Sequence, residues 1–135
     1  MSYGVSGALQ AAVFQALATD AALAAEVGTA IYDALPPGSL PPLYVTLGPE
    51  QAEDRSDVTA TGALHEFTVS VVSHQAGFAA AKAAAAAISD ALAGADLLLA
   101  RGRLVWLAFH KARAARAGTG DTRRIDLRFR ARVED

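Results

Sequence analysis

The 135-residue sequence contains no cysteine, only three histidines, and no long apolar run. The absence of cysteine excludes a disulfide scaffold, a thiolate zinc site and a cysteine nucleophile. The N-terminus lacks the basic start and continuous apolar centre of a signal peptide. The longest apolar stretch, residues 79–88, is mostly alanine, contains Lys82 and is too short to cross a bilayer. These absences predict a soluble protein made in the cytoplasm, with no membrane partner.

The motifs of common catalytic and ligand sites are also missing. No G-x-S-x-G element presents a serine nucleophile, and the glycine-rich segment 118–121 lacks the lysine and following helix of a phosphate loop. His65 and His110 fall in expected strands without a metal-ligand spacing, and the acidic segment 53–57 lacks the alternating pattern of a calcium loop. We therefore predict no enzymatic activity, no cofactor and no metal.

Apolar residues make up 53% of the chain, and 33 of them are alanine. A compact domain of this length buries about 68% of the surface that its unfolded chain exposes, which is enough for one core. We expect residues 1–135 to form a single domain.

Hydrophobic periodicity and turn residues predict three helices and five strands. Ser6 and Asp20 are the expected N-caps of the first two helices, and Gly28 ends the second. The expected helices cover residues 6–18, 20–27 and 76–93, and the expected strands cover 29–33, 43–47, 64–73, 103–111 and 122–133. This order predicts an α+β fold: a single antiparallel sheet of four to five strands, with the N-terminal helix and the long alanine-rich helix packed on one face.

The last strand has the cleanest alternation in the sequence, so its two faces are predicted directly. Five apolar side chains point to the core: Ile125, Leu127, Phe129, Ala131 and Val133. Five charged ones point outward: Arg124, Asp126, Arg128, Arg130 and Arg132. In strand 64–73 the same reasoning places His65 and Phe67 on one face and Glu66 and Thr68 on the other.

The net charge of −2 conceals a separation of charge along the chain. Residues 1–100 hold ten acidic and two basic side chains, a balance of −8, whereas residues 101–135 hold ten basic and four acidic ones, a balance of +6. The expected loop 48–63 carries −3 and the stretch 110–124 carries +4. Such complementary patches favour contacts between copies or with a partner, and arginine is a preferred interface residue.

Twelve charged residues are therefore the candidates for interface contacts. The acidic ones are Glu50, Glu53, Asp54 and Asp57, and the basic ones are Lys111, Arg113, Arg116, Arg123, Arg124, Arg128, Arg130 and Arg132. The segments 48–63 and 110–121 are expected to be long mobile loops that become ordered on contact with partners.

The order of segments is similar to that of a known family. The residues that carry the similarity are the helix end at 17–23, the segments 31–33 and 43–48, Gly62 before the strand 67–71, and Gly77 before the helix that ends at Leu92. The sequence resembles, over nearly its whole length, the tail terminator (tail completion) proteins of long-tailed phages, in particular those of gene transfer agents. Its alanine- and arginine-rich composition fits a GC-rich source but leaves open whether that source is a phage or a gene transfer agent.

The resemblance implies a structural role in assembly. Proteins of this family form a ring, usually hexameric, on the head-proximal end of the tail tube, where the ring stops tube polymerisation and provides the docking surface for the neck. The implied partners are further copies of the chain, the major tail-tube protein and a head-completion or neck protein, while DNA passes through the lumen as cargo. The implied location is the host cytoplasm during assembly and then the junction of tail and neck.

Two other functions compete with this interpretation. The first is a neck adaptor that bridges portal and tail. The second is a nucleic-acid-binding module that uses the arginine-rich last strand as a phosphate track. Such a module needs aromatic side chains interleaved with the arginines, and in this strand only Phe129, which is expected to face inward, lies among them.

The charge separation generates the first testable prediction. Substituting Arg113→Glu together with Arg116→Glu reverses two charges of the basic stretch, so we expect impaired docking with an unchanged fold. Particle assembly is the measurement, with circular dichroism of the purified variant as the control for folding. Unchanged assembly would count against this stretch as a contact.

Overall fold

The computed structural model describes residues 2–59, 61–118 and 120–135. Ala60 and Thr119, which fall within the expected loops, lie outside the described residues. The elements in chain order are a 3-10 turn η1 (Ser2–Val5), α1 (Ser6–Ala18), α2 (Ala21–Val27), β1 (Ile31–Tyr32), β2 (Leu43–Asp54), β3 (Gly62–Ser73), α3 (Ala79–Leu92), β4 (Arg103–Arg116) and β5 (Arg123–Glu134).

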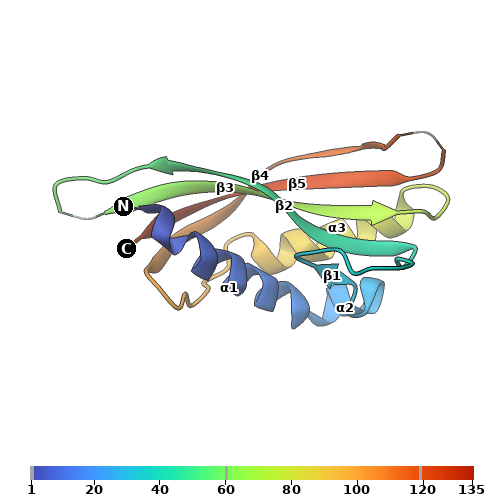
Figure 1. Ribbon diagram of the computed structural model, residues 1–135, viewed down its shortest axis with the longest axis horizontal. Helices are drawn as coiled ribbons and strands as arrows, with labels where there is room; N and C mark the ends of the chain where they lie inside the picture. The colour runs from blue at the N-terminus through green and yellow to red at the C-terminus, as the bar shows by residue number, and fades with distance from the viewer. Residues whose placement is uncertain (1, 60, 119) are drawn as a thin grey trace.

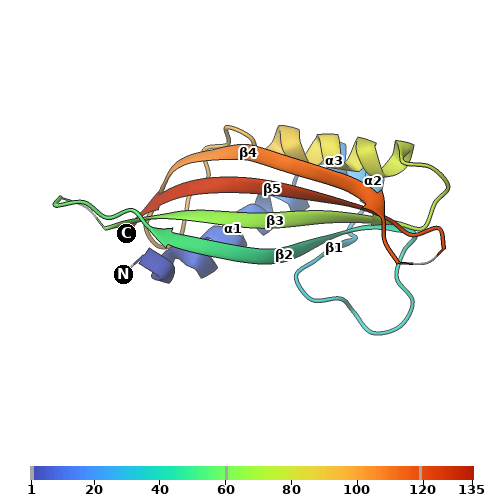
Figure 2. The same cartoon turned by 90° about the horizontal axis from the view of Figure 1, so that it is seen from above.

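The structure has two layers, a long twisted sheet and a layer of helices beneath it (Figure 1). The strand order is β1-β2-β3-β5-β4, and Figure 2 views this sheet from the face that the helices do not cover. The predicted α+β class is confirmed, but the prediction of a purely antiparallel sheet is wrong, because β1 pairs with β2 in parallel. The proline-rich connection 33–42 returns the chain to the starting end of β1 instead of turning it back as a hairpin.

Small and apolar side chains hold the helices against the sheet. In α1 the buried side chains are Leu9, Val13 and Leu17, one helical face at the spacing of four. In α3 the buried positions are mostly alanine, together with Ile88 and Leu92, so that this helix lies close to strands β3 and β5.

The expected helix at residues 6–18 has the predicted bounds, but its expected N-cap and the expected start of the third helix are wrong for local reasons. The N-cap of α1 is Val5 and not Ser6, because the hydroxyl of Ser6 donates to both carboxylate oxygens of Glu50, at 2.8 and 2.9 Å. Helix α3 begins at Ala79 and not at residue 76, because Gly77 has a φ of +72°, which lies outside the helical region.

The junction between α1 and α2 agrees with the capping prediction. The side chain of Asp20 accepts a hydrogen bond from the Leu23 amide at 2.9 Å, and Gly28, with φ +61°, ends α2. Within the described ranges no single helix is long and apolar enough to cross a membrane. The helical segments Tyr3–Ala18 and Ala21–Val27 reach that length and composition only when taken together, and they meet at a bend of 74°.

The two expected long loops are largely strands. Gly48 and Pro49 were expected to end a strand at residue 47, but they form a bulge, after which β2 continues to Asp54 opposite Ala63. Strand β4 likewise continues to Arg116, opposite Arg123, rather than ending at residue 111. Charged side chains are tolerated here because backbone pairing does not depend on them and both extensions project past the helices (Figure 1).

Aromatic rings form the centre of the core between the sheet and the helices. Phe129 is completely buried, and its ring centroid lies 5.7 Å from that of Phe67 and 5.9 Å from that of Phe109. Phe109 itself is 44% exposed, because it lies on the edge strand β4 beyond the helical layer.

This difference in burial predicts unequal effects of the same substitution. We expect Phe129→Ala to lower the free energy of unfolding by about 3–5 kcal/mol, since it leaves a cavity in the core. The matched control Phe109→Ala should cost no more than about 2 kcal/mol, because much of its ring is already in water. Denaturant unfolding of the two variants measures both values, and equal losses would contradict this packing.

Candidate protein interface

We call the sheet surface that faces away from the helices the open face. Cross-strand partners share a face, so the register of β3, β5 and β4 defines rows across it. Three of these rows are Glu66–Arg130–Ala108, Thr68–Arg128–Lys111 and Ser70–Asp126–Arg113. Of the basic interface candidates, the open face therefore holds Lys111, Arg113, Arg124, Arg128, Arg130 and Arg132. The predicted outward orientation of the last strand is confirmed.

Lys111 and Arg128 are directly opposed like charges on neighbouring strands. Such a pair is destabilising, and both side chains are exposed. Among the residues that the structure describes, neither these two side chains nor Arg113 has an acidic group within 4.0 Å. The three cations line a depression on the open face together with Asp126. This is the part of the surface where an acidic partner would relieve repulsion within the subunit.

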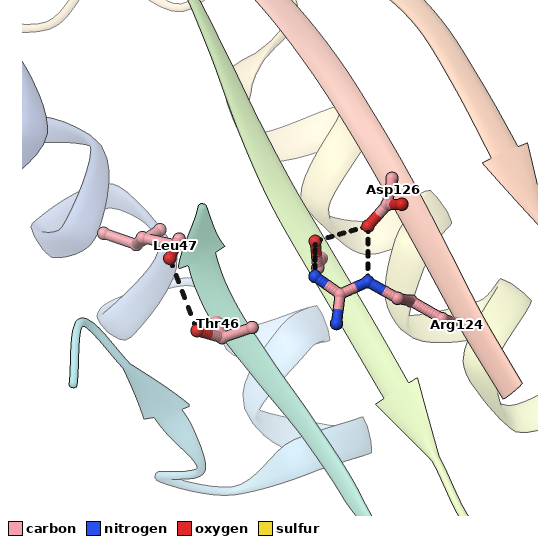
Figure 3. Close-up of polar contacts among 5 residues, drawn as sticks. Thr46, Leu47, Arg124 and Asp126 are labelled. Atoms are coloured by element: carbon pink, nitrogen blue, oxygen red, sulfur yellow. Dashed lines mark hydrogen bonds and ion pairs between the residues drawn. The ribbon is translucent and has the colours of Figure 1, made fainter. Parts of the chain in front are cut away.

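Arg124 has a partner within the chain. Its Nε donates to Asp126 Oδ1 at 2.9 Å, and the Ser70 hydroxyl donates to the same oxygen at 2.6 Å (Figure 3). Partial burial alone would raise the pKa of Asp126, but the hydrogen bonds from Ser70 and Arg124 and the charges of Arg124 and Arg128 outweigh it and hold this pKa below its usual range. Asp126 is therefore an anion that holds β3 to β5.

The remaining arginines of β5 also have contacts inside the subunit. Arg130 Nε lies 3.6 Å from Glu66 Oε1, and the same carboxylate oxygen lies 3.5 Å from His110 Nε2. Arg132 donates to the carbonyl oxygen of Arg55 at 2.7 Å, which ties β5 to the end of β2. Because of these contacts, Arg130 and Arg132 have fewer free hydrogen-bond donors and less unneutralised charge for binding a partner.

Three candidates lie on the helix-covered face instead of the open one. Arg123 is buried, donates to the carbonyl oxygens of Gln75 and Asp121, and lies 5.5 Å from the centroid of the Phe78 ring. Glu50 accepts hydrogen bonds from Ser6, and its Oε2 lies 3.2 Å from Nδ1 of the buried His65. Arg116 is exposed and pairs in register with Arg123, so it lies on the helix side. Arg123 and Glu50 thus have structural contacts in the subunit.

The other acidic candidates gather at the end of the β2–β3 hairpin. Glu53, Asp54 and Asp57 are exposed, and Glu53 lies 3.0 Å from Arg55. This end and the basic β4–β5 end lie at opposite extremes of the long axis (Figures 1 and 2). The structure thus brings six of the eight basic candidates together on the open face and places the acidic hairpin end at the other extreme of the subunit from the basic β4–β5 end.

The two strand histidines do not form a shared site. His65 lies on the helix side against Glu50, whereas His110 reaches Glu66 on the open face. No group of three or more potential metal ligands occurs among the described residues.

Sequence reasoning did not identify Trp106 and Phe109 as surface residues, although they are 45% and 44% exposed. The continuous apolar run 104–107 was the available signal, because a strand with one wet face should alternate. Bulges between Leu104 and Trp106 and between Phe109 and Lys111 shift the register of β4, so periodicity alone did not assign its faces.

The Asp126 network generates a pH-dependent prediction. Because the folded-state pKa of Asp126 lies below the ordinary value, its stabilisation is complete above about pH 5 and declines as the pH falls through the folded-state pKa. We expect Asp126→Asn to lower the free energy of unfolding by about 1 kcal/mol at pH 7, with the difference from wild type shrinking in acid. Urea unfolding between pH 3 and 7 would measure this, with Asp90→Asn on the exposed side of α3 as the control; a pH-independent difference would contradict the network.

Comparison with known proteins agrees with the resemblance seen in the sequence. The chain is 64% identical to a chain in the solved structure "Virion of native gene transfer agent (GTA) particle", with a TM-score of 0.95 over 99% of this chain and 100% of that one. No curated protein matches. The family model for tail completion protein gp17 matches residues 11–134, which is nearly the whole chain. The predicted family is confirmed, and the chain belongs to the tail completion proteins, which have a structural role in tail assembly.

Proposed function

We propose that this protein forms a ring, a hexamer by the pattern of its family, on the head-proximal end of a tail tube. The ring stops tube polymerisation and provides the surface on which the neck of the filled head docks. The observation that carries this proposal is the near-complete match to a chain of a gene transfer agent virion, at 64% identity and a TM-score of 0.95.

The charge distribution of the subunit supports a ring between two different partners. A ring forms from heterologous contacts, in which one surface of a subunit binds a different surface of its neighbour. The acidic hairpin end and the basic β4–β5 end supply two unlike surfaces at opposite extremes of one elongated subunit (Figure 2). Unlike surfaces also determine which partner binds on which side, because the wrong juxtaposition brings like charges together.

The cations of the open face fit a docking role. No carboxylate of the described residues lies within 4.0 Å of Lys111, Arg113 or Arg128, so an acidic surface of the tube or the neck protein would add neutralising charge beside them. In this proposal the protein acts without catalysis, is assembled in the host cytoplasm and ends at the junction of tail and neck. DNA passes through the lumen of the ring.

The test is a deletion of the gene in the producing strain. If the protein terminates the tube, its loss removes the block to polymerisation, so electron micrographs should show overlong tubes and heads without tails. Complementation with the wild-type gene should restore tubes of defined length.

Tubes of normal length in the deletion strain would contradict the proposal. Tubes of normal length that carry no heads would instead indicate a neck adaptor. Purified protein added to open tube ends provides an independent readout, because a terminator should cap them.

A further inference from the structure

A shallow apolar groove runs between α3 and the edge strand β4. The helix packs mainly under β3 and β5, so the helix side of β4 extends past it. The groove is lined by Phe109, Ala112 and Ala114 of β4, by Ile125 and Leu127 of β5, and by the 82–89 side of α3, and it has a volume of about 310 Å³. The exposed aromatic ring of Phe109 makes this groove a candidate contact site.

The end of the β2–β3 hairpin carries an aliphatic side chain that does not pack in the core of the subunit. Val58 is fully exposed. Residues 54–59 carry local hydrogen bonds, in which Ser56 Oγ donates to Asp54 at 2.6 Å and the amide of Thr59 donates to Asp57 at 2.8 Å. Such bonds reduce the conformational entropy that these residues lose when they bind a partner.

Charge complements the apolar fit. The hairpin end carries Glu53, Asp54 and Asp57 against Arg55, a balance of −2. Lys82 lines the groove, and Arg116 lies on the same side of β4 as Ala112 and Ala114. The acidic hairpin end with its exposed Val58 is therefore complementary, in charge and in polarity, to the apolar groove with its neighbouring basic residues.

A hairpin end cannot reach the groove of its own subunit. The hairpin extends beyond the row of Ala63 and Val133, whereas the groove is at the rows of Leu127 and Ile125. Six residues of extended strand between Val133 and Leu127 correspond to about 20 Å, and the hairpin joins β2 and β3 whereas the groove lies along β5 and the edge strand β4. A contact between them must join two copies, and it is heterologous.

We propose that in the ring the β2–β3 hairpin end of one copy inserts Val58 into the α3–β4 groove of the next copy. The inference rests on the proposed ring and identifies the contact that builds it. Glu53, Asp54 and Asp57 of the first copy then lie beside Lys82 and Arg116 of the second. The same contact covers the ring of Phe109, which is 44% exposed in the single subunit.

The absence of cysteine makes disulfide cross-linking a direct test. The double variant Val58→Cys with Ala112→Cys is expressed as the only copy in a producing strain, and purified particles are oxidised and run on a non-reducing gel. Both sites are exposed, so the substitutions should leave the fold intact. Because each copy would be joined to the next, we expect a ladder of multimers beyond the dimer.

The matched control is Val58→Cys with Leu98→Cys, which keeps the hairpin cysteine and moves the second cysteine to another exposed site outside the groove. This pair should give monomers and dimers only. A ring seen in micrographs of the double-variant particles without a ladder would overturn the groove contact and leave the ring standing. Particles whose tube ends carry no ring would overturn the proposed function itself, and a ladder of equal extent in the control would also overturn the groove contact.

Discussion

The twelve-row pairing between β3 and β5 is the interaction on which the rest of the structure depends. It runs without a bulge from Gly62 opposite Glu134 to Ser73 opposite Arg123. Strand residues alternate between faces, so this register places Phe67 and Phe129 against the helices and Thr68 and Arg128 on the open face. A slip of one residue would exchange the two sets and bury the charges. The core and the basic surface are therefore consequences of the same pairing.

The outer strands β2 and β4 pair less regularly, and their bulges shape the surfaces that we propose as partner contacts. Strand β2 has a bulge at Gly48 and Pro49, and β4 has two bulges, one on each side of Leu107. Bulges bend an edge strand and protect it from pairing with other strands. The ends of these strands project past the helices as hairpins, acidic at one extreme and basic at the other. The overall charge of −2 thus describes a strongly polarised subunit.

Much of this architecture was predictable, because local patterns report on local structure. The alternation in β5 gave the correct assignment of its faces, and the cap at Asp20 placed α2. The direction of β1 was not predictable, because two residues carry no information about the strand that they join. The bulges of β2 and β4 were missed because Gly48 and Pro49 also end strands and because a bulge interrupts the period from which a strand is recognised.

The surface charges could be predicted by region, whereas the surroundings of each charged residue could not. Charge counting identified the basic and acidic segments correctly as surfaces of opposite sign. It could not separate Arg123, which is buried beside Phe78, from Arg113, which is exposed, because both are arginines in one basic run. Nor could it find the groove at Phe109, which depends on α3 packing mainly under β3 and β5 and covering β4 only in part. Partners within the chain depend on register and helix placement, and both are tertiary properties.

The central claim is that one elongated subunit with two unlike ends builds a ring by joining each end to the opposite end of its neighbour. The most direct measurement is a cryo-electron microscopy map of the head-proximal tube end in intact particles, at a resolution that traces the chain. The account predicts a closed ring in which the acidic hairpin end of every copy contacts the α3–β4 side of the next copy, with the open face of β4 and β5 turned toward the tube or the neck. Copies joined through the same surface on both partners, or a tube end without this chain, would contradict it.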